Sequence, residues 1–486
     1  MNLSYVCLSD LHLGASTSLL TDTPAVANEP THSAKRLRDA FAEAFTKTLA
    51  ALGTQAPSAA APDLVLLGDI FDMSLGTPKS SIETFDKLLK SLASHGARGQ
   101  LGSCAFLPGN HDHELWTVSR FTHMVAEKVD DDIYTHITPA FANPDSRPRA
   151  ALIDQLLRDN GFAGASTFYP NMGLMTENAD RMVIFHHGHF IEPVYRAMST
   201  LTMMLDGRPE ILLNAESLER ENASWIDFLW STDGDDGRLG AEIMFAHDAL
   251  LTGRDDILVQ HRLADILTRK IAAALPLPHT AKAREGTKTA ARAIVDSVLG
   301  TYGQMERFSY QQTLGADGRA GLISYLSDTV RKQIEQEKPG TVPSELSFVF
   351  GHTHKPFEQR LSVPGYTVPP AVYNTGGWSM DTPMFGTRLG ASAMFVDSEL
   401  NLAALRLCDV PQDDDAVPGC VRVATADGTL AGNPLAQALH EAVNDAGDAW
   451  HAFTKEAAAA YRIKQAFIMA QLRARDGGDC GKEGAA

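Results

Sequence analysis

The chain is poor in cysteine. Its five cysteines among 486 residues are an odd number, widely spread and without a C-x-x-C pair. This pattern argues against a disulfide framework and against a zinc site built from thiolates. It favours reduced thiols, and we therefore expect a cytoplasmic protein. The five are Cys7, Cys104, Cys408, Cys420 and Cys480.

Long apolar runs are also absent. No stretch approaches the roughly 18 to 20 apolar residues that a membrane-spanning helix needs. Residues 1–20 lack the basic region and the sustained apolar region of a signal peptide. We therefore expect no membrane span, although contact with a membrane surface or a lipid substrate stays compatible with the sequence.

Basic residues are outnumbered by acidic ones. Lys and Arg number 42 against 60 Asp and Glu, which gives a formal net charge of -18. The long-range field of such a chain repels polyanions, and no basic stripe with interleaved aromatic residues offsets it. We do not expect nucleic acid as a partner.

The length sets the scale of the architecture. A chain of 486 residues exceeds one ordinary core, so we expect either several domains or one catalytic domain with large insertions. Hydrophobic residues make up 44% and charged residues 21%, as in ordinary globular proteins. The composition says nothing about oligomeric state.

Five short apolar runs have the form of buried strands, and each ends at a polar motif. The runs cover residues 3–8, 63–67, 105–107, 182–185 and 346–350. Amphipathic helices are predicted between them at 34–52 and 81–95. Alternating strands and helices predict a layered α/β domain, with the polar motifs at the carboxyl ends of the strands, where such sheets bind ligands.

The rest of the chain divides by pattern. We expect a first core segment at 1–190, a helical insertion at 191–344, a second core segment at 345–410 and a mostly helical extension at 411–486. Helical spacing is strongest at 263–275 and 294–299 within the insertion, and at 435–472 in the extension. A smaller irregular insertion is expected at 130–169, and a hairpin is expected from strands at 393–397 and 402–407.

The five polar motifs supply carboxylate, imidazole and amide ligands without thiolate. Such ligands suit Mn²⁺, Fe or Zn²⁺, and two ions about 3.5 to 4 Å apart can hold a phosphoryl group and activate water. Each motif alone is more often structural than catalytic, but five in this order point to a metal site. The motifs are Asp10-Leu11-His12, Gly68-Asp69-Ile70-Phe71-Asp72, Gly109-Asn110-His111-Asp112, His187-Gly188-His189 and Gly351-His352-Thr353-His354.

In these motifs the chain resembles the calcineurin-like metallophosphoesterase superfamily, whose pattern is D-x-H, G-D-x-x-D, G-N-H-D/E, H-G or H-G-H, and G-H-x-H. The resemblance covers about residues 1–112, 182–189 and 346–378. It implies a four-layer α/β/β/α sandwich, here with a large helical insertion and a C-terminal helical extension. It also implies two divalent metal ions, for which Mn²⁺ is our first choice and Fe or Zn²⁺ the alternatives.

The resemblance assigns a role to each matching position. It implies that one metal is bound by Asp10, His12 and His354, and the other by Asn110, His187 and His352. Asp69 would bridge the two ions. His111 would face the phosphate as a catalytic residue, stabilising its charge or protonating the leaving oxygen. Asp112, also expected in the catalytic machinery, and Asp72 would orient a ligand or His111.

Several neighbouring residues allow more than one interpretation. Strand alternation turns His186 away from the face that carries His187. His189 is expected either to touch substrate or to support the ligands, and His113 is expected to be an ordinary loop residue. Asn374 and Trp378 match a recurrent N-T-G-x-W ending in the superfamily, for which we expect a structural role near the site.

The leading function is therefore a metal-dependent phosphohydrolase that cleaves a phosphomonoester, phosphodiester or pyrophosphate bond of a small substrate by in-line attack of a bridging hydroxide. The helical insertion raises the alternative of a UDP-diacylglucosamine-type lipid-nucleotide pyrophosphatase, since those related enzymes carry helices between the same motifs. A nuclease is a second alternative, disfavoured by the charge. A noncatalytic scaffold is a third, disfavoured because no ligand is missing. A protein phosphatase is left undecided.

Overall fold

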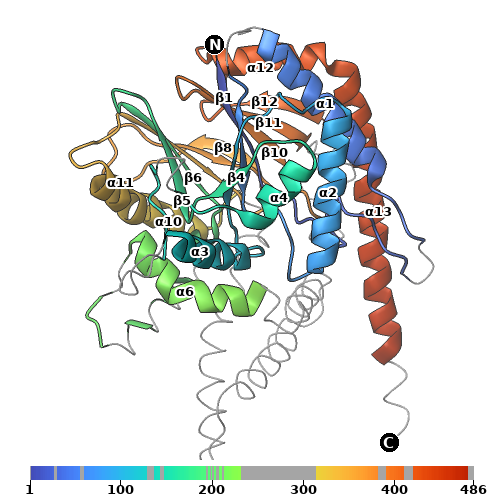
Figure 1. Ribbon diagram of the computed structural model, residues 1–486, viewed down its shortest axis with the longest axis horizontal. Coiled ribbons are helices and arrows are strands. Elements are labelled where there is room, and N and C mark those ends of the chain that lie inside the picture. Colours follow the sequence, from blue (N-terminus) through green and yellow to red (C-terminus); the bar gives the residue numbers. More distant parts are fainter. Residues whose placement is uncertain are drawn as a thin grey trace, which may run out of the picture.

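The computed structural model contains two β-sheets packed face to face, with helices on both outer sides (Figure 1). All structural statements below concern the residues that it describes. These are 2–26, 30–54, 60–127, 136–142, 147–192, 195–196, 199, 202–203, 207–210, 213–230, 313–380, 390–409 and 420–479.

The first sheet has seven strands in the order β12-β11-β10-β1-β2-β3-β4. Strands β1 to β4 run parallel, so the loops that follow them gather at one edge of the sheet. The predicted hairpin is confirmed, since β10 and β11 pair antiparallel and β10 also pairs with β1. The strands are β1 (Leu3–Leu8), β2 (Asp63–Leu67), β3 (Cys104–Leu107), β4 (Ala165–Thr167), β10 (Ser392–Asp397), β11 (Leu402–Asp409) and β12 (Cys420–Ala424).

The second sheet has five strands in the order β5-β6-β7-β9-β8. Its central strands β6, β7 and β9 run parallel, so the fourth and fifth motifs also follow neighbouring strand ends. The strands are β5 (Asn171–Met175), β6 (Arg181–His186), β7 (Glu345–Phe350), β8 (Phe357–Arg360) and β9 (Ala371–Asn374).

Strand alternation divides the apolar side chains between layers. Val65 and Leu67 point into the core between the two sheets, where they share a cluster with Phe185. Leu64 and Leu66, from the other face of the same strand, belong to the cluster under the helices. The four-layer α/β/β/α arrangement predicted from the motifs is thereby confirmed.

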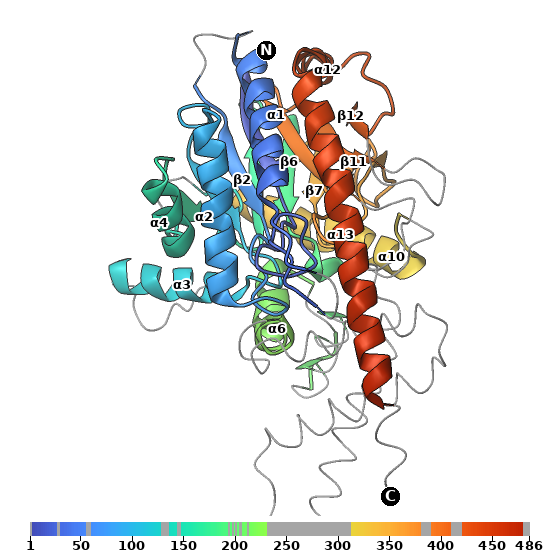
Figure 2. The same ribbon diagram turned by 90° about the vertical axis from the view of Figure 1, so that its right-hand side faces the viewer.

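One outer layer covers the seven-stranded sheet. In it α1, α2 and α13 run side by side (Figure 2), and α12 packs on β11. These helices are α1 (Lys35–Thr54), α2 (Pro78–Ser94), α12 (Pro434–Asp445) and α13 (Gly447–Asp479). The helical segment predicted at 435–472 is confirmed and consists of two helices, which meet near Ala446.

The other outer layer comes from the segment predicted to be helical. Its described helices are α6 (Ala215–Trp230), α10 (Ala316–Ser324), a π-helical turn at Tyr325–Val330, and α11 (Arg331–Glu337). Leu322 and Leu326 are fully buried against the five-stranded sheet. The helices predicted at 263–275 and 294–299 lie outside the described residues.

The prediction of an irregular segment at 130–169 is wrong for its second half. That half contains helix α4 (Ala151–Asp159) and strand β4 at the sheet edge. Strand β4 has only three residues and a weakly apolar sequence, which gives no local signal. Helix α3 (Glu114–Glu127), directly after the third motif, was likewise not predicted.

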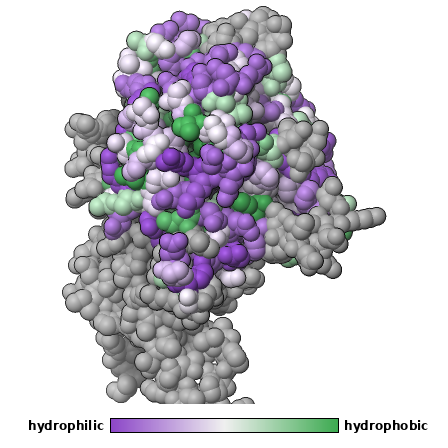
Figure 3. Space-filling view, turned by 90° about the vertical axis from the view of Figure 1, so that its left-hand side faces the viewer, coloured by the Kyte–Doolittle hydropathy of each residue, from purple (hydrophilic) through white to green (hydrophobic). Residues whose placement is uncertain are grey.

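Among the described helices, none is both long and apolar enough to cross a bilayer. The face of the molecule shown in Figure 3 is mainly hydrophilic, with hydrophobic residues scattered over it.

Two motif glycines allow the strand-end loops to come together. A Cβ atom on Gly351 would lie 1.9 Å from Asp10 Oδ2, and one on Gly109 would lie 2.2 Å from Asp69 Oδ1. Real atoms cannot approach so closely, and Gly109 also faces backbone of Asp69. The motifs need glycine at these positions because a carboxylate from another motif occupies the space of the missing side chain.

We predict that Gly351→Ala lowers the free energy of unfolding by about 1 to 3 kcal/mol, because the added methyl overpacks a buried contact. Chemical denaturation measures this change. Gly53→Ala is the control, since a Cβ there meets no atom within 4 Å. Equal stabilities of the two variants would contradict the packing described here.

We also predict that Phe453→Ala lowers the free energy of unfolding by about 3 to 5 kcal/mol. Phe453 of α13 is fully buried, and its ring lies 6.0 Å from Phe41 and 6.2 Å from Trp378. The same denaturation experiment applies. Substitution of the exposed His451 in the same helix by alanine is expected to leave stability unchanged.

Candidate metal centre

The predicted site residues come together at one edge of the sandwich. Asp10 and Asp69 follow the parallel neighbours β1 and β2, and Asn110 follows β3. From the other sheet, His187 follows β6 and His352 follows β7. All seven predicted ligands are at least nine-tenths buried.

Asp69 lies at the centre of this cluster. Its Oδ2 atom is 3.2 Å from His187 Nε2 and 3.5 Å from His12 Nε2, while Oδ1 accepts a hydrogen bond from the backbone of His111. Three groups of residues could each hold a metal ion, because within each group one ligand atom per residue lies within 4.8 Å of the others. Asp69 belongs to two of these groups. The groups are Asp10 with His12 and His354, His12 with Asp69 and His111, and Asp69 with His187 and His352.

In three of the histidines, the ring nitrogen that points away from the cluster, Nδ1, has a hydrogen-bonding partner. His187 Nδ1 donates to the carbonyl of Leu67 at 3.2 Å, and His12 Nδ1 lies 2.8 Å from Asp72 Oδ2. His354 Nδ1 lies 3.2 Å from the hydroxyl of Ser379. Metal-binding histidines are commonly fixed in this way, since the bond to one nitrogen selects the tautomer that presents the other.

The inward nitrogens face acceptors. Because Nδ1 of His187 donates to a carbonyl, a neutral ring turns the lone pair of Nε2 toward Asp69 Oδ2 and toward Asn110 Oδ1, 3.2 Å away. Three electron-rich atoms then face one another in a buried space. A cation among them removes the repulsion, so the donor set fits a bound metal ion.

The protonation of the cluster reflects the same electrostatics. Burial lowers the pKa of His187, but the adjacent Asp69 carboxylate outweighs it and raises the pKa to about 9. Burial, together with the charge of Asp69, raises the pKa of Asp10 to about 7. Asp10 Oδ2 is buried and has no hydrogen-bond partner among the described residues.

The backbone at the ligands is strained. Asp10, His12 and Asp69 have φ values of 50°, 46° and 50°. His352 and His354 have φ values of 67° and 56°. Non-glycine residues avoid this left-handed region, at a cost of order 1 to 3 kcal/mol each, and persist there mainly at functional sites. The loops are therefore shaped for ligand placement and against local backbone preference.

Asp112 and Asp72 hold the loops. Both Asp112 oxygens accept backbone N–H groups, from Gly109 at 2.6 Å and from Ile70 at 2.8 Å among others, so this carboxylate ties the second motif to the third. Asp72 contacts His12 through one oxygen and His111 Nδ1, at 3.2 Å, through the other. The geometry gives both residues orienting contacts.

The remaining histidines are placed differently from one another. His186 faces away from the cluster and lies against Tyr325, with ring centroids 4.5 Å apart, as strand alternation predicts. His189 Nε2 lies 3.2 Å from the hydroxyl of Tyr169. His113 lies in the loop before α3, as expected, but it is completely buried, between Glu219 and Asp227 of α6.

Residues at the end of β9 and just after it contact the backbone of the fifth and first motifs. Asn374 donates to the carbonyl of Gly351 at 2.9 Å, and the backbone N–H of Trp378 donates to the carbonyl of Asp10. The Trp378 ring is buried against Phe41 of α1. These contacts agree with a structural role near the site.

Sequence reasoning missed several residues around the cluster. Glu192 is buried with Oε1 3.4 Å from His352 Nε2, and Ser74 lies 2.7 Å from His111 Nδ1. Ser379 and Glu219 were also missed. Glu192 and Ser379 lie just beyond recognised motifs, and their closeness to these motifs in sequence could have identified them. Glu219 has no motif near it.

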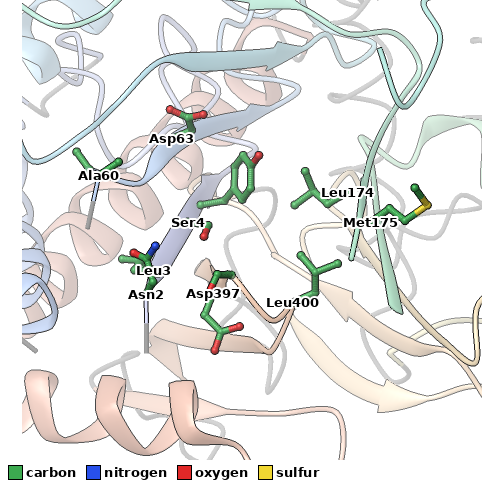
Figure 4. Close-up of a pocket in the computed structure, with 12 residues that line it drawn as sticks. Asn2, Leu3, Ser4, Ala60, Asp63, Leu174, Met175, Asp397 and Leu400 are labelled. Atoms are coloured by element: carbon green, nitrogen blue, oxygen red, sulfur yellow. The ribbon is translucent and has the colours of Figure 1, made fainter. Parts of the chain in front are cut away.

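A cavity of about 410 Å³ opens elsewhere, at the amino ends of the strands (Figure 4). Tyr5 and Asp63 from one sheet and Leu174 from the other line it. It contains none of the predicted site residues; Asp10 and Asp69 follow the opposite, carboxyl ends of β1 and β2, whose amino ends line the cavity. We therefore do not assign the active site to it.

Comparison with known proteins agrees with this geometry. The family model described as calcineurin-like phosphoesterase matches residues 3–264, more than half of the 486-residue chain. No curated protein matches the chain. The fifth motif lies beyond the matched residues, but the fold brings it against Asp10, whose Oδ1 accepts the backbone N–H of His352 at 2.7 Å. The predicted family is confirmed: the chain belongs to the calcineurin-like phosphoesterases and is a hydrolase acting on phosphoester bonds.

Proposed function

We propose that the protein is a phosphohydrolase that uses two divalent metal ions to cleave a small phosphorylated substrate. One observation carries this proposal: two of the three groups of buried potential ligands share the Asp69 carboxylate, and the third, made of Asp10, His12 and His354, shares His12 with one of them. Two cations held by these groups would be bridged by Asp69.

We assign the ligands as the motifs suggest. Asp10, His12 and His354 would hold one ion, and Asn110, His187 and His352 the other. Oxygen and imidazole donors without sulfur suit Mn²⁺, our first choice, and also Fe or Zn²⁺. Ions bound there would polarise a phosphoryl oxygen and lower the pKa of water at the site.

His111 is our candidate for the residue that handles the proton. Its Nδ1 lies 2.7 Å from Ser74 Oγ and 3.2 Å from Asp72 Oδ1, so these oxygens fix the ring and favour a proton on Nδ1. We assign Nε2 of His111 the task of donating a hydrogen bond or a proton to a phosphate oxygen of the substrate.

We infer the substrate class from the net charge and from the position of α6 near the third motif. The net charge of -18 disfavours nucleic acid, and α6 lies close to the third motif through His113, which favours a small substrate over a phosphoprotein. A phosphomonoester, phosphodiester or pyrophosphate bond fits the site. A lipid-nucleotide pyrophosphatase is a narrower version of the same proposal. Cys7, Cys104 and Cys408 are free and buried, in keeping with a reducing, cytoplasmic environment.

The Mn²⁺-loaded protein is expected to hydrolyse one class within a panel of aryl phosphomonoesters, aryl phosphodiesters, UDP-linked sugars and single-stranded DNA. Asp69→Asn should abolish this activity and reduce bound metal, measured by elemental analysis, because the amide loses the bridging charge. Asp63→Asn is the control, since Asp63 begins the same strand but lines the distant cavity. An active Asp69→Asn protein with full metal content would refute the assignment. Activity on DNA alone would replace it with a nuclease.

His111→Asn is expected to keep its metal and to turn over more slowly by about 10² to 10⁴-fold, because only the proton-handling group is lost. Steady-state kinetics and elemental analysis together test this expectation. Substitution of the exposed His440 by asparagine is the matched control. Loss of metal from His111→Asn would show instead that His111 is itself a ligand.

A further inference from the structure

A buried polar network joins helix α6 to two of the histidine motifs. Figure 1 shows α6 beside α3, and the network crosses this contact. His113, at the start of α3, places Nε2 3.1 Å from Glu219 Oε1 and Nδ1 2.8 Å from Asp227 Oδ1. Both carboxylates belong to α6, so the imidazole is held between two turns of that helix.

Glu219 continues the network toward the other histidine loop. Its second oxygen accepts a hydrogen bond from the hydroxyl of Tyr169 at 2.8 Å. That hydroxyl lies 3.2 Å from His189 Nε2. The four residues His113, Tyr169, His189 and Glu219 are completely buried. One carboxylate therefore connects α6 to the loops of the third and fourth motifs.

The electrostatics make this connection strong. Burial lowers the pKa of His113, but Glu219 and Asp227 outweigh burial and raise the pKa to about 10. A protonated imidazole between two carboxylates, one fully buried and one 25% exposed, forms charge-assisted hydrogen bonds, which are stronger than neutral ones. Removal of one partner leaves a buried charge poorly compensated.

The network does not have the geometry of a third metal site. His113 uses both ring nitrogens, which point in different directions, so its two carboxylate partners cannot share one ion with it. Among the described residues, the groups of potential metal ligands include none of these four side chains.

The position of the network gives it a consequence for the site. His113 is two residues from His111, and His189 is two residues from His187. A shift of α6 would therefore displace His111, which we assign to the phosphate, and His187, which we propose as a metal ligand. We propose that Glu219 is a positioning residue that fixes α6 against both histidine loops and sets their placement. This inference rests on the proposed function for its catalytic consequence, but not for its structural one.

Two variants test it. Glu219→Gln keeps an acceptor for Tyr169 but removes the negative charge beside His113, and Tyr169→Phe removes only the hydroxyl. In hydrogen exchange followed by mass spectrometry, we expect Glu219→Gln to speed exchange in peptides covering residues 110–117 and 187–192. Tyr169→Phe should affect mainly the second peptide. With metal content unchanged, kcat should fall by up to about 100-fold in Glu219→Gln, because small displacements near reacting groups are costly.

Glu221→Gln is the matched control. Glu221 lies on the same helix and pairs with Arg208 at 2.5 Å, but neither partner is in the network. This variant should speed exchange within α6 alone and leave kcat unchanged. If Glu219→Gln and Glu221→Gln behave alike in both measurements, the positioning role is wrong. If the wild type is inactive on every substrate, the proposed function fails, and the exchange pattern alone still decides whether Glu219 ties α6 to the loops.

Discussion

The structure depends on a concentration of buried negative charge and lone pairs around Asp69. Asp10, Asp69, Asp72 and Asp112 are all within one-hundredth of complete burial, and the imidazoles among them turn their inward nitrogens toward acceptors. Such a cluster is unfavourable unless cations or protons enter it. Five of the ligands also have left-handed φ values, which adds strain of about 1 to 3 kcal/mol at each. The surrounding fold must supply the stability that the site lacks.

The topology of the two sheets brings the motifs together and fixes their positions. Parallel pairing of β1, β2 and β3 brings the first three motifs to one edge, and parallel pairing of β6 and β7 brings the last two to the facing edge. The core between the sheets contains Val65, Phe185 and Val349, each fully buried just before a motif begins. Rigid strand ends thus fix the positions of the residues that we propose as ligands.

Features with a local sequence pattern could be predicted from the sequence, and features that depend on contacts between distant residues could not. The strands and their motifs carry local patterns, so the sheets, the ligand cluster and the outward turn of His186 were predictable. The contact of His113 with Glu219 joins residues 106 positions apart, and neither has a neighbouring pattern that identifies the other. The short strand β4 is stabilised by pairing with β3 and has no propensity of its own to detect. Tertiary contacts, which leave no local trace, account for the burial of His113 and for β4, whereas α4 was missed although its sequence is amphipathic.

The segments outside the motifs bear directly on the site. From the C-terminal extension, Lys464 of α13 is buried and donates hydrogen bonds to the carbonyls of Ser16 at 2.7 Å and Thr21 at 2.9 Å, in the loop that follows the first motif. Burial lowers the pKa of this amine to about 7, so the loop is held by a group that gives up solvation to reach it. Glu219 of α6 contacts the loops of the third and fourth motifs through His113 and Tyr169. Two helices that lie outside the motifs in sequence therefore contact the loops of the candidate metal centre, which otherwise depend on the strand ends for their positions.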